Sequence, residues 1–277
     1  MKYSEFQINA ADGTLLFMRH HIPEGFRSHA IVVHGFAEHS GRYDELVEFF
    51  ARHGIATFLF DLRGHGRSQG RRSYVSSFEE YVSDLLVVSR RAAEIAGSGE
   101  FILFGHSMGG LIAAHFSGRR PAQVKALVLS SPFVGFSMKV PAAKAAAGKL
   151  MSRVWPTLAL PTGIDPAVVS HDEAVVKAYD TDPLNNKVAT ARWFTEVVAA
   201  QPRAIDLIRG YQGPLLVLQA GDDKLADPAA TRTLFEAAGS QTKEMQVFEG
   251  FYHEVLNEVD RQAVYDTMER WMAKQSV

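Results

Sequence analysis

Residues 101–114, FILFGHSMGGLIAA, require the chain to reverse direction sharply between two apolar segments. Phe101–Phe104 contain no polar side chain, which is typical of a strand buried on both faces of a sheet. Gly109–Ala114 continue as an apolar run that predicts a helix packed against this strand. The chain must therefore turn around Ser107 within about two residues, where backbone angles are sparsely populated. A side chain kept in such a strained turn indicates a function for that side chain.

The chain as a whole alternates short apolar runs with amphipathic stretches. This alternation predicts an α/β fold with a mostly parallel central sheet flanked by helices. An opening hairpin turns around Ala11–Gly13, and further strands are expected at 30–35, 55–61, 101–107, 126–131, 214–220 and 244–250. Helices are expected at 43–53, at 77–97 and at about 259–274, the second beginning at a capping box formed by Ser77 and Glu80.

Residues 134–212 break the alternation. They contain prolines, alanines and helical patterns but no strand-like run. An insertion between two neighbouring strands is best interpreted as a helical cap, and open α/β sheets bind ligands beyond the carboxyl ends of their strands. We therefore expect a core formed by 1–133 and 213–277 and a cap, or lid, formed by 134–212.

Composition excludes several classes of protein. The chain of 277 residues has a net charge of −2, so it lacks the basic surplus of a nucleic-acid-binding protein. It has no cysteine, which excludes disulfides, thiolate catalysis and cysteine-ligated metals. The N-terminus has no apolar signal segment, and no run of about 18 apolar residues occurs. We expect a cytoplasmic protein; no oligomeric state is predicted.

The segment GHSMG, residues 105–109, fits the G-x-S-x-G pattern of a nucleophile elbow. Glycines on both sides remove side chains that would clash in the turn, and the backbone N–H groups that open the next helix face the serine hydroxyl. The pattern alone is weak, and the alternative is a glycine turn with a bystander serine. Its place between a strand and a helix favours Ser107 as a nucleophile.

A serine nucleophile needs a base, and in this fold class the chain order is Ser, then Asp or Glu, then His. Only His115, His171 and His253 follow Ser107. His115 lies in the helix that leaves the elbow and His171 in the expected cap, whereas His253 follows the last strand. By elimination, His253 is the predicted base.

The acid is expected after the strand at 214–220, where three aspartates occur. Asp227 precedes Pro228 and a helical run, which is the pattern of an N-cap followed by proline in the first turn. We therefore interpret Asp227 as structural. Spacing alone does not separate Asp222 from Asp223.

Five segments together resemble one branch of a known family. They are HGFAEHSGRY (34–43), DLRGHGRS (61–68), GHSMGG (105–110), LQAGDDKLAD (218–227) and FEGFYHE (248–254). In this order they are similar to the monoacylglycerol lipases and lysophospholipases of the α/β-hydrolase superfamily. The resemblance implies the α/β-hydrolase fold, cleavage of a lipid-like carboxylic ester through an acyl-serine, and no need for a cofactor or metal.

The resemblance also assigns roles by position. Ser107 and His253 match the family's nucleophile and base, and the catalytic acid falls on Asp223. The backbone N–H groups of Phe36 and Met108 match the family's oxyanion hole.

The implied substrate-binding residues are Glu38, Arg42 and His106, the first two matching positions near the alcohol part of the substrate. The chain departs from the pattern at Leu256, where some relatives have a second histidine that faces glycerol. The resemblance therefore implies ester cleavage but leaves the alcohol open.

The expected cap begins with a basic segment. Residues 133–164 contain no acidic residue, whereas Lys139, Lys144, Lys149 and Arg153 are present. A basic amphipathic helix suits the surface of an anionic membrane, so the cap is a candidate for peripheral contact at the inner membrane surface. The alternative is an ordinary lid helix with a solvated lysine face.

Two rival functions remain open at this point. A serine peptidase of the same fold needs carboxylates in the cap to bind an N-terminal amine, and Asp172, Glu173, Asp180 and Asp182 are candidates. A non-catalytic binding protein could use the same fold, but it would have no need of a complete triad. Aspartate nucleophiles, as in dehalogenases and epoxide hydrolases, are excluded by Ser107.

Overall fold

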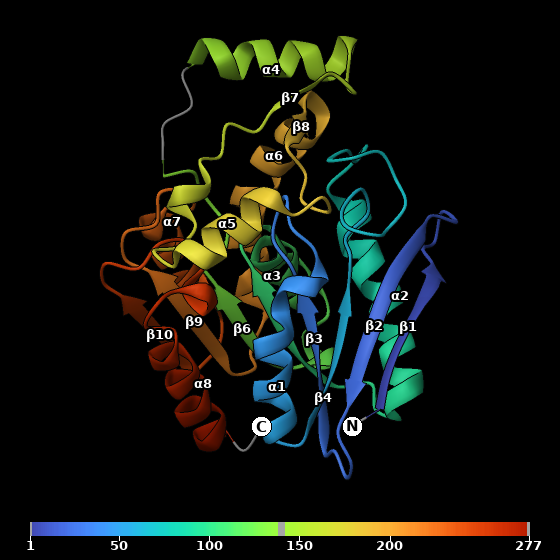
Figure 1. Cartoon of the computed structure of the whole chain (residues 1–277), viewed down its shortest axis with the longest axis vertical. Helices are drawn as coiled ribbons and strands as arrows, with labels where there is room; N and C mark the ends of the chain where they lie inside the picture. Colours follow the sequence, from blue (N-terminus) through green and yellow to red (C-terminus); the bar gives the residue numbers. More distant parts are fainter. Residues whose placement is uncertain (1, 138–141, 276–277) are drawn as a thin grey trace.

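The computed structural model describes residues 2–137 and 142–275, the side chains of 142–145 excepted. Its centre is an eight-stranded sheet in the order β1-β2-β4-β3-β5-β6-β9-β10 (Figure 1). β2 is antiparallel to both β1 and β4, and the other neighbours in the sheet are parallel. The strands are β1 (Lys2–Asn9), β2 (Leu15–Ile22), β3 (Ser28–Val33), β4 (Ile55–Phe60), β5 (Phe101–His106), β6 (Val124–Ser130), β9 (Leu215–Ala220) and β10 (Lys243–Phe248). The predicted α/β fold is confirmed.

Helices cover both faces of the sheet. Every residue of β4, β5 and β9 is buried, which explains why these strands are mostly apolar. One apolar cluster lies under α1 and α8, and a second lies under α2, α3 and α7. The helices are α1 (Asp44–Arg52), α2 (Glu79–Ala96), α3 (Met108–Arg119), α7 (Pro228–Ala237) and α8 (Gln262–Gln275), the last of which begins later than predicted.

The predicted capping box at the start of α2 is wrong. The helix begins at Glu79, and its N-cap is Phe78, which has no side-chain acceptor for a helix N–H. The Glu80 carboxylate accepts a hydrogen bond from the Ser76 amide (3.2 Å), not from Ser77. The N-cap thus lies one residue after the predicted Ser77, whose hydroxyl accepts the Glu79 N–H (3.3 Å) instead.

The segment between β6 and β9 is mostly helical, but it also contains a short antiparallel pair of strands. The expectation of no strand there was wrong, since β7 and β8 have three residues each, too few to show an apolar period. Figure 1 shows α4 farthest from the sheet, with β7, β8 and part of α6 between them. The elements are α4 (Ala142–Val154), β7 (Ala159–Pro161), α5 (Glu173–Thr181), β8 (Val188–Thr190) and α6 (Ala191–Leu207).

Helix α6 joins this segment to the core. Its residues Val197, Ala200 and Ala204 are buried in the same apolar cluster as α3, and the His115 ring bonds the Ala200 carbonyl (2.9 Å). The division into core and cap at residues 134–212 thus stays a prediction. Within residues 2–137 and 142–275, no helix has the length and apolar character needed to cross a bilayer.

Candidate active site

Ser107 occupies a strained turn between β5 and α3. Its φ is 52° and its ψ is −119°, in a region that residues with a side chain rarely adopt. A Cβ on Gly109 would overlap the Val33 carbonyl, so the close approach of α3 to β3 requires glycine there. The Ser107 N–H donates to the Ser130 carbonyl and its own carbonyl accepts from the Phe133 N–H, each at 2.9 Å. These bonds hold the hydroxyl in place against the strain.

Three side chains from separate loops form one hydrogen-bonded chain. His253 follows β10, and its Nε2 lies 2.8 Å from the Ser107 Oγ. Its Nδ1 lies 2.8 Å from the Asp223 Oδ2, in the loop after β9. All three residues are buried. The order Ser–His–Asp is the arrangement in which an imidazole can take the proton of a serine hydroxyl.

The structure shows which of the two neighbouring aspartates, Asp222 or Asp223, faces His253. The Asp223 Oδ1 accepts the backbone N–H groups of Leu225 and Ala226, both at 2.9 Å, which leaves Oδ2 for the imidazole. Asp222 is exposed. Asp227 is the N-cap of α7, as predicted, and accepts the Ala229 N–H.

The groups around His253 favour its protonated form more than bulk water does. Burial opposes protonation, but the Asp223 carboxylate outweighs this effect, so the pKa of His253 is raised. His106, whose ring centroid lies 4.9 Å from that of His253, has the opposite shift: burial lowers its pKa to about 4, and it stays neutral at neutral pH.

We predict the pH dependence of turnover from this shift. A protonated His253 cannot accept the Ser107 proton, so kcat/KM should rise with pH through the pKa of His253. Because Asp223 stabilises the protonated form, the midpoint should lie above the ordinary value of 6.5. Initial rates with an uncharged ester from about pH 5 to about pH 9 measure it; a midpoint below 6.5 would contradict the assignment.

Two backbone N–H groups lie free beside the elbow. Met108 is the first residue of α3, and Phe36 lies in the loop that follows β3. In the described part of the chain, neither amide donates a hydrogen bond to a backbone carbonyl, strand and helix ladders included. Free donors at a helix N-terminus are suited to stabilise an oxyanion.

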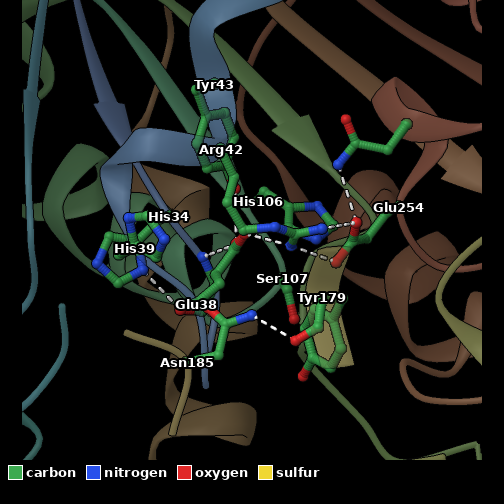
Figure 2. Close-up of polar contacts among 12 residues, drawn as sticks. His34, Glu38, His39, Arg42, Tyr43, His106, Ser107, Tyr179, Asn185 and Glu254 are labelled. Carbon is green, nitrogen blue, oxygen red and sulfur yellow. Dashed lines mark hydrogen bonds and ion pairs between the residues drawn. The ribbon is translucent and has the colours of Figure 1, made fainter. Parts of the chain in front are cut away.

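The predicted substrate-binding residues Glu38 and Arg42 belong to a buried ionic network (Figure 2). The Arg42 guanidinium lies between two carboxylates, 2.9 Å from Glu38 and 2.7 and 2.8 Å from the two oxygens of Glu254. Glu38 also accepts hydrogen bonds from the Gly35 N–H and the Tyr43 hydroxyl. The network thus joins the loop of Phe36 to the residue that follows His253.

The charges of this network are held by their mutual contacts. Burial opposes ionisation of Glu38, but Arg42 outweighs it and the pKa of Glu38 is lowered to about 2. His106 bonds the Ser130 hydroxyl through Nδ1 (3.1 Å). Since Glu38, Arg42 and His106 are engaged with the protein itself, their role toward a substrate stays a prediction.

Sequence reasoning missed Glu254 as a member of the site. Its carboxylate also accepts the Asn257 side-chain amide (2.8 Å), and its N–H donates to the Val169 carbonyl (2.9 Å). A single charged residue in a loop carries no pattern, and its only signal was its place beside His253. Leu256, the position of the departure, is buried in the apolar cluster under α8.

Three of the four carboxylates of the rival peptidase interpretation have partners within the protein. Asp172 is the N-cap of α5, Asp180 pairs with Lys187 (3.1 Å), and Asp182 pairs with His39 (2.9 Å). A cavity of about 520 Å³ is lined by Glu173, Asp180, His171 and Tyr252 among others, and Ser107 is not part of its lining. No three His, Asp or Glu side chains of the described chain come together as a metal-binding group.

The fold and this site define the chain as an α/β hydrolase. It belongs to the hydrolase family described as serine aminopeptidase, S33, whose model matches residues 26–260. The human monoglyceride lipase is 34% identical over 272 residues, which cover 96% of this chain and 89% of that protein. The phospholipase YtpA of Bacillus subtilis is 32% identical over 85% of this chain and 91% of its own.

Solved structures give the same assignment. The crystal structure of the Paleococcus ferrophilus monoacylglycerol lipase is 29% identical, with a TM-score of 0.83 over 99% of this chain and 100% of the other. Among the sequence relatives, an abhydrolase domain-containing protein of Dictyostelium discoideum is 32% identical over 87% of this chain, which spans 26% of that longer protein. The resemblance predicted from the five sequence segments is confirmed.

Proposed function

We propose that the protein is a carboxylic ester hydrolase that cleaves lipid-like monoesters, such as a monoacylglycerol or a lysophospholipid, through an acyl-serine intermediate. The observation that carries this proposal is the continuous chain from the Ser107 hydroxyl through His253 to Asp223, with both contacts at 2.8 Å. The relatives named monoglyceride lipase and phospholipase support the lipid substrate.

The first half of the reaction follows from the geometry. The His253 Nε2 takes the proton of Ser107 as the Oγ attacks the ester carbonyl carbon, while Asp223 stabilises the imidazolium that forms. The carbonyl oxygen becomes an oxyanion that accepts hydrogen bonds from the Phe36 and Met108 amides. The imidazolium then gives its proton to the departing alcohol oxygen, and the acyl group remains on Ser107.

The second half repeats these steps with water. His253 takes a proton from the water molecule as its oxygen attacks the acyl carbon, and the same two amides stabilise the second oxyanion. When the tetrahedral intermediate collapses, His253 returns the proton to the Ser107 Oγ and the carboxylic acid leaves. Apart from this water molecule, every group in these steps comes from the chain or the ester.

A row of aromatic side chains beside Ser107 suits a substrate with an apolar acyl group. The Phe133 N–H donates to the Ser107 carbonyl, and the Phe133 ring packs at 4.7 Å against that of Phe136. Phe136 in turn lies 5.9 Å from Phe194 of α6. This row leads from the elbow toward α4, and we assign it to the acyl chain.

A substrate panel tests the proposed function. Purified protein is assayed with monoacylglycerols and lysophospholipids of rising acyl length, with aminoacyl amides beside them and Ser107→Ala as the blank. Release of fatty acid from the lipid esters, and none from the blank, is expected. Faster turnover of the aminoacyl amides would replace the esterase proposal with a peptidase, and no turnover of any member would favour a binding protein.

The cap is our proposed site of peripheral membrane contact. Helix α4 and the residues after it expose large apolar side chains, with Leu150, Val154 and Trp155 between 58% and 70% exposed. Lys149 and Arg153 lie exposed on the same helix. Exposed apolar side chains beside cations suit an anionic lipid surface. The side chains of Lys139 and Lys144 lie outside the described residues, and the cytoplasmic location stays a prediction.

Loss of the two described cations should weaken vesicle binding. Each basic residue near an anionic surface contributes about 1 kcal/mol, so the double variant Lys149→Ala/Arg153→Ala should bind anionic vesicles roughly 30-fold less tightly. Co-sedimentation with vesicles measures this loss. The control is Arg120→Ala/Lys125→Ala, which removes two exposed cations near the start of β6, whereas α4 follows the end of that strand. Equal binding of anionic and zwitterionic vesicles would count against membrane contact.

A further inference from the structure

One side chain of α6 contacts both residues that carry the proposed oxyanion amides. The Trp193 indole stacks on the Phe36 ring with the centroids 3.8 Å apart and 25° between the planes. Its Nε1–H donates to the Met108 Sδ at 3.3 Å. Phe36 lies in the loop after β3 and Met108 at the start of α3, so Trp193 connects that loop to the helix that leaves the elbow.

Trp193 is itself held firmly. It is only 5% exposed, and its backbone N–H donates to the Thr190 hydroxyl, the N-cap of α6, at 3.3 Å. The same hydroxyl donates to the Ser73 carbonyl of the core at 2.6 Å. The indole therefore has a fixed position relative to the sheet, which a side chain needs if it is to fix others.

The Phe36 loop needs such support. The next residue, Ala37, has a φ of 63°, which is unfavourable for a residue with a side chain. The Phe36 ring is half-buried and contacts the edge of His65 (5.6 Å) in addition to the Trp193 face. Because the amide direction follows the orientation of the loop, removal of the stacking partner lets the Phe36 N–H turn away.

We propose that Trp193 is a positioning residue for the oxyanion hole. It holds the Phe36 and Met108 amides so that both point at one oxygen, and it does so from α6, in the segment between β6 and β9. This inference rests on the proposed function, because it assumes that those two amides stabilise the oxyanion. It assigns no contact with the reacting atoms to the indole itself.

Two substitutions separate the two contacts. Trp193→Ala removes both the stacking and the N–H donor, and we expect kcat to fall by about 10- to 100-fold with KM within about twofold, because oxyanion contacts act in the transition state. Trp193→Phe keeps an aromatic face against Phe36 but loses the bond to the Met108 sulfur, a weak acceptor, and should lose only about threefold.

A transition-state analogue provides the decisive readout. An alkyl trifluoromethyl ketone forms a hemiketal oxyanion on Ser107, so its inhibition constant should rise by the same factor as kcat falls. The inhibition constant of the product fatty acid and the pH midpoint of kcat/KM should stay as in the wild type. A structural defect that disturbed the whole site would instead change all of these quantities together.

Trp271→Phe is the matched control for loss of an indole. Trp271 lies in α8, is 1% exposed, and within the described residues its Nε1 has no hydrogen-bond partner. We expect the kcat of Trp271→Phe to equal that of the wild type, even if the substitution lowers the thermal stability. If Trp193→Ala does not fold, Trp193→Phe against Trp271→Phe decides the question.

The failures of the two proposals are distinguishable. Full turnover by Ser107→Ala would remove the proposed function and this inference with it. Wild-type kcat and ketone affinity in the Trp193 variants, with Ser107→Ala inactive, would overturn only the positioning role. An equal loss of kcat in Trp271→Phe would overturn it as well.

Discussion

Ser107→Ala is expected to lower kcat by about 10⁵- to 10⁶-fold, because the substitution removes the atom that forms the acyl-enzyme. His253 and Asp223 remain in place in this variant but have no hydroxyl to activate. Residual hydrolysis of about 10³-fold over water should persist from the two free amides and from substrate binding. The variant should fold normally, since the substitution removes only the 2.8 Å side-chain hydrogen bond to His253.

The matched control for this result is Ser117→Ala. Ser117 lies in α3, is fully buried, and within the described residues its hydroxyl has no hydrogen-bond partner. Its loss should leave kcat within about twofold of the wild type. Rates are measured by fatty-acid release at saturating ester. Activity of Ser107→Ala within tenfold of the wild type would exclude an acyl-serine at this position.

Arg42→Met is expected to destabilise the protein by about 3–5 kcal/mol, because it leaves the Glu38 and Glu254 carboxylates buried without their shared cation. Both carboxylates lie within 3 Å of the guanidinium in the wild type. Methionine fills a similar volume, so the loss reports the charge and not a cavity.

The pH dependence of this loss has a definite sign. In the wild type the pKa of Glu38 is lowered to about 2, so its contribution is present above the ordinary value of 4.5 and is lost as the pH falls toward 2. Without Arg42 the burial of Glu38 is no longer outweighed, so its carboxyl group prefers to be protonated and its pKa rises. The variant should therefore be least stable at neutral pH and regain part of its stability on mild acidification.

Urea unfolding at two pH values measures both effects. Arg91→Met is the control, because Arg91 forms an exposed pair with Glu94 that should contribute less than about 1 kcal/mol. If Arg42→Met stays within about 1 kcal/mol of the wild type at neutral pH, the network does not hold the Phe36 loop to the His253 loop.

Local sequence was sufficient to predict the sharp turn at Ser107. The apolar run before Ser107 and the glycines on both sides are consequences of one buried strand meeting one closely packed helix. Local sequence also predicted that Asp227 is the N-cap of α7, since an N-cap followed by proline is a pattern of neighbouring residues. Spacing could not separate Asp222 from Asp223, because only the turn that orients Leu225 and Ala226 distinguishes them.

The parts of the site that sequence reasoning missed depend on distant residues. Arg42 and Glu254 are separated by 212 positions, and no local pattern marks them as partners. Trp193 is an aromatic residue on an amphipathic helix, where burial in the core is the ordinary explanation. The capping box at Ser77 failed for the opposite reason, since a correct local spacing was overridden by the path of the chain into α2.

The most direct measurement is the site of covalent labelling by an alkyl fluorophosphonate, located by peptide mass spectrometry. Only an activated nucleophile beside an oxyanion hole reacts readily with this reagent. We expect one adduct per chain, on the peptide that contains Ser107, with activity lost in proportion to labelling. An adduct on another residue, or an unlabelled Ser107 in an enzyme that still turns over its ester, would contradict the account.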